Sequence, residues 1–140
     1  MSYLLDTNVV SEWARPRPEP RVVAWLACVD EDTVHLSVIT VAELQCGIEL
    51  LPPGPKRERL ARWLAGDLLD RFEGRLLDVT RDVAREWGMI SAEAQNAGRP
   101  MGVVDAFFAA TARVRGLTLV TRNDAHFRHA GIELLNPWTD

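Results

Sequence analysis

Short apolar runs alternate with amphipathic stretches along almost the whole chain. We expect strands where apolar residues cluster, at residues 2–5, 34–38, 76–79, 117–121 and 132–135. We expect helices where apolar residues recur every three or four positions, at residues 7–14, 21–29, 40–51, 56–71, 81–97 and 103–114. This alternation predicts an α/β fold, a three-layer α/β/α sandwich with a mostly parallel sheet of four or five strands.

Length and composition predict one domain over residues 1–140, because a chain of this size with 47% apolar residues can build one ordinary core. No apolar run approaches the roughly 18 residues of a membrane span, and the N-terminus has no basic stretch leading into a long apolar one. We therefore expect a cytoplasmic protein without a membrane partner. Cys28 and Cys46 lack the close pairing of a redox or zinc motif, and we expect both thiols to be buried.

The net charge of −4 does not by itself favour a polyanionic partner. The basic residues nevertheless fall partly into two groups. These are Arg15, Arg17 and Arg21, and then Lys56, Arg57, Arg59 and Arg62. Either group could bind phosphates through forked donors, and either could simply form a solvated helix face that keeps the protein soluble.

Acidic and amide side chains occur where strands give way to helices or where helices begin. Asp6 ends the first expected strand, Glu43 lies in the first turn of a helix, and Asp105 begins another helix. Asn123 and Asp124 close the fourth strand. Because the carboxyl ends of parallel strands share one edge of the sheet, these oxygens can converge on one metal site.

Each of these residues also has an ordinary structural role that its local sequence allows. Asp6 suits a helix N-cap, and Glu43 would complete a capping box with Thr40. Asp105 would complement a helix dipole, and Asn123 with its acidic neighbour suits a turn. Only the combination of all four positions favours a shared site.

Neighbouring residues complete the expected site. Asn8 is expected either to orient Asp6 or to serve as a plain turn residue, and Thr121 adds a hydroxyl at the end of the fourth strand that would help to orient the ligands. Carboxylates brought together repel unless a cation neutralises them, and a hard divalent ion suits oxygen ligands. Zinc is not expected, because His126 and His129 lack further clustered nitrogen or sulfur ligands.

Four motifs, in order, resemble the PIN-domain family, and in particular the VapC-type toxins of bacterial toxin–antitoxin pairs, including the FitB-like branch. They are Leu5-Asp6-Thr7-Asn8-Val9-Val10-Ser11-Glu12, Ser37-Val38-Ile39-Thr40-Val41-Ala42-Glu43-Leu44, Asp105-Ala106-Phe107-Phe108-Ala109-Ala110-Thr111-Ala112, and Thr121-Arg122-Asn123 with Phe127 and Asn136-Pro137-Trp138. The resemblance extends essentially from one end of the chain to the other.

This resemblance implies a metal-dependent endoribonuclease that binds Mg²⁺ or Mn²⁺, with Asp6, Glu43 and Asp105 at the family's acidic positions. Many relatives place Asp where this chain has Asn123, and Asp124 is one residue out of register. An amide oxygen can ligate an ion but brings no charge, so we expect one firmly held ion and at most a weaker second. The expected reaction is in-line attack by a metal-activated water, with Glu43 or Asp105 accepting its proton, and the products carry 5′-phosphate and 3′-hydroxyl ends.

Partners are also implied by the resemblance. VapC-like toxins form homodimers and are held inactive by a small DNA-binding antitoxin of the VapB or FitA type, so we expect both partners beside the RNA substrate. Large apolar residues such as Trp13, Trp25 and Leu60 could serve an interface, and core packing is the alternative for them.

Two other functions are compatible with acids at a sheet edge. A response-regulator receiver needs a lysine near the end of its last strand, but the sole lysine here is Lys56. A PIN-like module with weakened catalysis, binding RNA or a protein, would explain Asn123. The presence of Asp6, Glu43 and Asp105 argues against that loss of catalysis.

Overall fold

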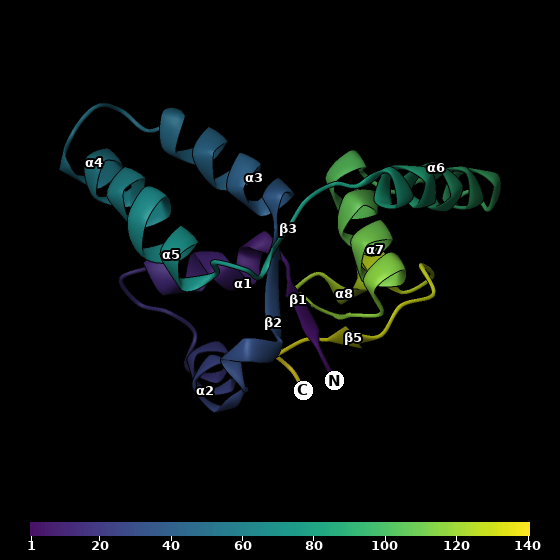
Figure 1. Ribbon diagram of the computed structural model, residues 1–140, viewed down its shortest axis with the longest axis horizontal. Coiled ribbons are helices and arrows are strands. Elements are labelled where there is room, and N and C mark those ends of the chain that lie inside the picture. Colours follow the sequence, from purple (N-terminus) through teal and green to yellow (C-terminus); the bar gives the residue numbers. More distant parts are fainter.

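The computed structural model describes residues 1–140 and contains a five-stranded parallel sheet in the order β3-β2-β1-β4-β5 (Figure 1). The strands are β1 (Tyr3–Leu5), β2 (Val34–Ser37), β3 (Leu76–Leu77), β4 (Thr118–Val120) and β5 (Leu134–Leu135). The predicted α/β fold is confirmed. The sheet is wholly parallel and has five strands, where four or five were expected. Because all strands run the same way, the carboxyl ends of β1, β2 and β4 lie at one edge.

Eleven helical segments connect and cover the strands. They are α1 (Thr7–Ser11), η1 (Glu12–Ala14), α2 (Pro20–Cys28), η2 (Glu31–Thr33), α3 (Val38–Glu49), α4 (Pro55–Arg62), η3 (Trp63–Leu68), α5 (Leu69–Arg71), α6 (Arg81–Asn96), α7 (Val103–Arg115) and α8 (Asp124–Phe127). Every helix expected from periodicity is present. The two short segments η2 and α8 were not expected, because three or four residues are too few to show a helical repeat.

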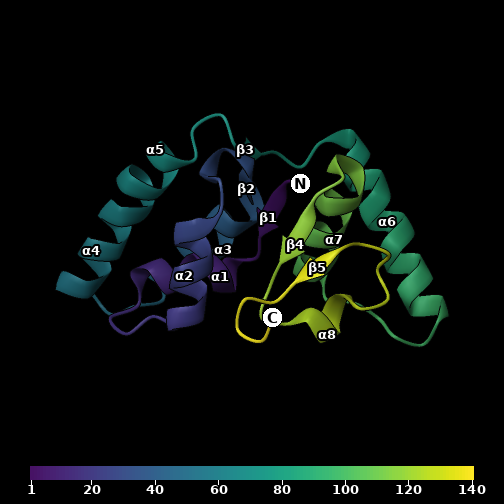
Figure 2. The same cartoon turned by 90° about the horizontal axis from the view of Figure 1, so that it is seen from below.

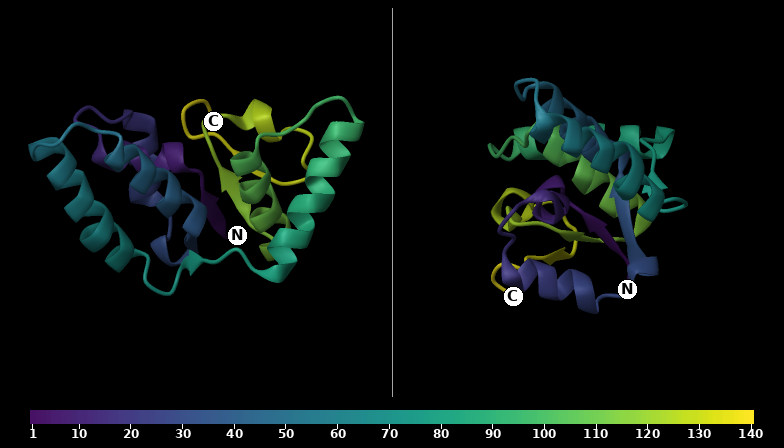
Figure 3. Two further views of the ribbon diagram at one scale, coloured as in Figure 1. Left: turned by 90° about the horizontal axis from the view of Figure 1, so that it is seen from above. Right: turned by 90° about the vertical axis from the view of Figure 1, so that its left-hand side faces the viewer.

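Helices cover both faces of the sheet (Figure 2). The neighbouring residues Leu4 and Leu5 of β1 point to opposite faces, and each joins a different core cluster. On the Leu4 face the cluster includes residues of α6, α7 and α8, whereas on the Leu5 face it includes residues of α1, α2, α3 and η3. Figure 3 shows the same division, with α3 and α4 on one side of the strands and α6 and α7 on the other. The strands are therefore buried on both sides, as their apolar sequences require.

The stretch expected as one helix over residues 56–71 is continuous but changes its pitch. Between α4 and α5 the segment η3 (Trp63–Leu68) is π-helical. Leu64 and Leu68 of this segment are buried in the core. A π-helical turn shifts the faces of the helix on either side of it, which the regular spacing of apolar residues does not reveal.

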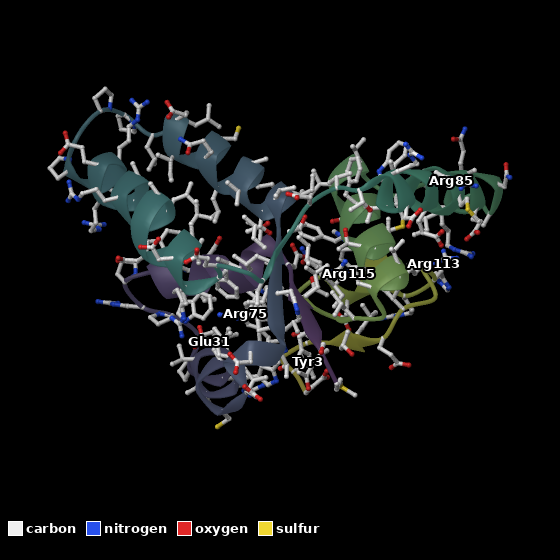
Figure 4. The ribbon with its side chains drawn as sticks, in the orientation of Figure 1. Tyr3, Glu31, Arg75, Arg85, Arg113 and Arg115 are labelled. Atoms are coloured by element: carbon white, nitrogen blue, oxygen red, sulfur yellow. The ribbon has the colours of Figure 1, made fainter.

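Arg75 joins the start of β3 to the neighbouring strand. Its guanidinium donates to the carbonyl oxygens of Glu31 and Val34 at 2.5 and 2.7 Å. Arg71 forms an ion pair with the Glu31 side chain, and this hydrogen bond lowers the pKa of the Glu31 carboxyl. Figure 4 shows Glu31 and Arg75 close together below α5.

Both cysteines are exposed, so the prediction that Cys28 and Cys46 are buried is wrong. Cys28 is the last residue of α2, and Cys46 lies on the outer side of α3, whose buried residues are Thr40 and Ile48. Apolar neighbours in the sequence suggested burial, but the orientation of each helix turns the thiol to solvent.

No helix in the structure combines the length and the apolar character that crossing a bilayer demands.

The large apolar residues that could serve an interface or the core are mostly packed against the core. Trp13, Trp25 and Leu60 are each partly buried against the cluster on the Leu5 face. Trp13 contacts the ring of Phe72 with a centroid distance of 5.9 Å. Core packing therefore accounts for most of their surface, and their exposed edges remain available.

Candidate active site

Asp6 lies at the centre of the carboxyl edge, directly after β1. Its backbone N–H donates to the carbonyl oxygen of Val120 at 2.9 Å, which extends the pairing of β1 with β4 by one residue. The side chain is only 6% exposed, and its Oδ2 accepts hydrogen bonds from Thr121 Oγ1 at 2.7 Å and from Asn8 Nδ2 at 3.2 Å. Asp6 serves as N-cap residue of α1 without any side-chain capping bond, so its carboxylate is held by Thr121 and Asn8.

Glu43 lies in the second turn of α3, and the capping box predicted for it with Thr40 is absent. The helix begins two residues earlier, because Ser37 is its N-cap and the Ser37 Oγ accepts from the Ile39 N–H at 3.0 Å. Glu43 Oε1 instead accepts from Thr7 Oγ1 at 2.6 Å. The structural role that competed with a site role is therefore gone, and the carboxylate is directed toward α1.

Asp105 occupies the first turn of α7, as the sequence predicts. Its Oδ2 lies 3.1 Å from His126 Nδ1, and its side chain is 28% exposed. His126 comes from α8, and the sequence drew attention to it only as a histidine without the partners of a zinc site. The contact was not foreseeable, because it depends on how α8 packs beside the start of α7.

Asn123 and Asp124 leave the end of β4 in different directions. The Asn123 N–H donates to Thr121 Oγ1 at 3.0 Å, and the Asn123 side chain is exposed at the start of α8 without a capping bond. Asp124 Oδ1 accepts from Asn136 Nδ2 at 3.3 Å, which ties it to the C-terminal segment. The Asn123 side chain forms no hydrogen bond, whereas the Asp124 side chain bonds to Asn136.

Electrostatics at the edge are set by burial of one acid beside two others. Burial raises the pKa of Asp6, the hydrogen bond from Thr121 and the backbone of Thr7 lower it, and the charges of Asp105 and Glu43 raise it further. Glu43 of α3 and Asp105 of α7 thus lie near enough to Asp6, at the end of β1, for their charges to act on it. No three acidic, histidine or cysteine side chains close into a ready-made group of metal ligands.

We expect the Asp6→Asn variant to melt about 3–6 °C above the unchanged protein at neutral pH in the presence of a chelator. The pKa of Asp6 is raised above its ordinary value of 3.8, so folding favours its neutral form. The stability that this preference contributes is complete below the unfolded-state pKa of about 3.8 and is lost as the pH rises through the higher folded-state pKa.

The difference in Tm between the two proteins should therefore be largest near neutral pH and should shrink as the pH falls toward about 4. Differential scanning calorimetry of both proteins over this range measures it. A variant that melts below the unchanged protein at neutral pH would mean that the bonds from Thr121 and Asn8 outweigh the cost of burying the charge.

Glu12 is a second buried acid, and it lies outside this site. Its side chain is 2% exposed, Oε1 accepts from Arg15 at 3.3 Å, and the buried Oε2 has no hydrogen-bond partner. Its sequence position, in the same motif as Asp6, gave no sign of this burial.

Known proteins align with this chain over nearly its whole length. The family model for the PIN domain matches residues 3–133. Toxin FitB of Neisseria gonorrhoeae is 42% identical over 137 residues, covering 98% of this chain and 99% of that protein. VapC ribonuclease Y4jK of Sinorhizobium fredii is 37% identical over 135 residues, covering 96% of each. The solved structure of FitAB bound to a DNA fragment superposes with a TM-score of 0.93 at 39% identity, over 99% of this chain and 96% of that one. These matches confirm the resemblance seen in the motifs: the chain belongs to the PIN-domain family.

Proposed function

We propose that this protein is a metal-dependent endoribonuclease that acts as the toxin of a toxin–antitoxin pair. The observation that carries the proposal is the placement of Asp6, Glu43 and Asp105, from three different elements, around one edge of a parallel sheet. The ribonuclease and toxin names of the relatives, which align over almost the full length, support it. A divalent ion and the acids would together act on an RNA phosphodiester.

The residues at this edge fit a Mg²⁺ or Mn²⁺ ion. All of the side chains involved offer oxygen, which hard cations prefer, and Asp6 is buried beside two other acids whose charges raise its pKa. Mg²⁺ keeps several of its own waters, so it need not be ligated directly by three carboxylates. We assign Asp6 as the direct ligand, with Glu43 and Asp105 binding directly or through waters and Asn123 adding a neutral oxygen. Asp124 is less suited, because it bonds to Asn136.

Because Asn123 brings no charge to the site, we propose one firmly bound ion and at most a weaker second. When bound, a divalent ion acidifies a water molecule and stabilises the charge that develops on the phosphate. Glu43 or Asp105 would accept the proton of the attacking water, and Thr121 and Asn8 would hold Asp6 in place. The water oxygen would bond to phosphorus as the bond to the 3′ oxygen breaks, and the 3′ oxygen would take a proton from solvent water, which gives 5′-phosphate and 3′-hydroxyl ends.

Partners are proposed on the same basis. The solved structure of FitAB bound to DNA, one chain of which this protein resembles over almost its full length, supports a small DNA-binding antitoxin as the partner that holds this protein inactive. We also propose a homodimer. Its test is the mass in solution at high micromolar concentration, where a strictly monomeric protein would contradict the proposal.

The experiment that tests the function is cleavage of a mixed RNA pool by the purified protein, with Mg²⁺, with Mn²⁺ and with a chelator. We expect cleavage only with metal, fragments that carry 5′-phosphate and 3′-hydroxyl ends, and no cleavage by an Asp105→Asn variant purified in the same way. Fragments with cyclic phosphate ends would indicate attack by the 2′-hydroxyl and exclude the proposed reaction. Equal activity of protein and variant would indicate a contaminating nuclease.

A further inference from the structure

A cleft of about 680 Å³ opens directly beside Asp105. Its walls come from the C-terminal half of α6, the loop from Ala97 to Gly102, and α8 with the turn that follows. Asp105 itself forms part of one wall, and so does His126, which contacts it. The cleft therefore borders the candidate active site at Asp105, and Asp6 is not among its lining residues.

The lining of this cleft combines an apolar floor with basic groups. Ile90, Ala94, Met101 and Ala130 provide apolar surface. The basic groups are Arg99, His126 and His129, all with exposed side chains. A nucleotide has the matching chemistry, because its base is a flat, largely apolar ring and its phosphate accepts hydrogen bonds from arginine and histidine. A volume of this size is also typical of cavities that hold small organic groups.

Two acids line the cleft, Asp105 and Glu93, and the charge of Glu93 is partly offset. Glu93 Oε2 lies 3.4 Å from Arg113 Nη1, and Arg113 also pairs with Glu86 at 3.1 Å. Arg113 does not line the cleft and is shared between the two glutamates, so it offsets the charge of Glu93 only in part. Asp105 belongs to the candidate metal site, and Arg99 is the permanently charged cation of the lining, with His126 and His129 adding ring nitrogens. A phosphate that enters the cleft beside Arg99 therefore meets a forked donor.

We propose that this cleft holds the nucleotide next to the scissile phosphate, with Arg99 and His129 donating to its phosphate and Met101 packing against its base. The proposal rests on the proposed ribonuclease function. A base can enter the cleft only if it is unstacked, so the substrate is single-stranded at this position. Arg99 and His129 are positioning residues, since the phosphate that they would hold is the flanking one and not the reacting one.

The test compares the unchanged protein with an Arg99→Gln/His129→Gln variant and with Ala97→Phe, which narrows the cleft without changing its charge. Arg115→Gln is the matched control for charge. Arg115 ends α7, so it lies about 15 Å along the helix from Asp105, and Figure 4 shows it with Arg113 at that end. Circular dichroism of every variant checks that the fold is retained.

Binding is measured first, by fluorescence anisotropy with a short labelled single-stranded RNA pool in chelator, so that the result does not depend on catalysis. We expect the double variant to bind about tenfold more weakly and the slope of log affinity against log salt to fall by about 0.7 for each lost phosphate contact. Ala97→Phe should weaken binding with an unchanged slope, and Arg115→Gln should change neither quantity. A duplex of the same sequences should bind no more weakly to the variants than to the unchanged protein.

Cleavage is then measured with metal. We expect KM to rise about tenfold in the double variant while kcat stays within about twofold, because the contacts to the flanking phosphate act in substrate binding as well as in the transition state. Unchanged affinity and salt slope in both cleft variants would overturn the cleft assignment, even if the unchanged protein cleaves RNA. Loss of binding in the cleft variants of a protein that cleaves no RNA would retain the cleft as a nucleotide site and reject the proposed catalytic function.

Discussion

Glu43→Gln is expected to lower the rate of RNA cleavage about 100- to 1,000-fold with almost no loss of stability. Glu43 accepts a hydrogen bond from Thr7 at 2.6 Å, and the amide oxygen of Gln can accept the same bond. The helix start is also unaffected, because Ser37 caps α3. The substitution thus removes one negative charge from the site and leaves the local packing intact.

The measurement is the single-turnover cleavage rate with saturating Mg²⁺, together with Tm of the metal-free protein. Glu58→Gln is the matched control, since Glu58 is an exposed acid on α4 that forms no ion pair. We expect that control to retain full activity. If Glu43→Gln cleaved RNA as fast as the unchanged protein, Glu43 would have only the structural role of joining α3 to α1.

Thr121→Val is expected to lower activity about 10- to 100-fold, mainly by weakening the binding of the metal ion. The Thr121 side chain is completely buried, and its hydroxyl donates to Asp6 at 2.7 Å and accepts from the Asn123 N–H at 3.0 Å. Valine keeps the shape of the side chain but removes both bonds. The Asp6 side chain is then free to turn away from the site, and the backbone N–H of Asn123 loses its hydrogen-bond acceptor.

Titration of activity with Mg²⁺ separates this effect from simple destabilisation. We expect the midpoint of the titration to move to higher Mg²⁺ concentration in Thr121→Val and to return close to that of the unchanged protein in Thr121→Ser, which restores the hydroxyl. In an Asp6→Asn background the same change should have little further effect on ion binding, because the two residues act as a unit. An unshifted midpoint in Thr121→Val would show that the hydroxyl does not act through Asp6.

The sheet was predictable from sequence because its strands are buried on both faces. Such strands are short apolar runs, as at Leu4-Leu5 and in the stretch from Thr118 to Val120, and the helices between them repeat their apolar positions regularly. Local sequence patterns predicted the first residue of a helix less reliably. Thr40 and Glu43 have the spacing of a capping box, but Ser37 lies earlier in the chain and caps the helix instead.

The candidate site could be predicted as a set of residues but not as a set of contacts. Strand order and direction bring Asp6 and Thr121 to the same edge, so their proximity follows from the parallel α/β topology. The contact of His126 with Asp105 depends on α8, which has only four residues and shows no periodicity. The same limit applies to Cys28 and Cys46, whose exposure depends on how each helix is rotated against the core.

The sequence by itself determined the parallel α/β sandwich, the acids at its carboxyl edge and the family to which the chain belongs, because periodicity and motif order are local properties of the chain. Only the tertiary structure decided which partners those acids have. Thr7 bonds to Glu43 and Thr121 bonds to Asp6, although 36 and 115 positions separate the two members of each pair. The cleft beside Asp105 likewise exists only because α6 and α8 pack around the start of α7. Contacts between residues so distant along the chain depend on the packing of whole elements, and no local pattern records that packing.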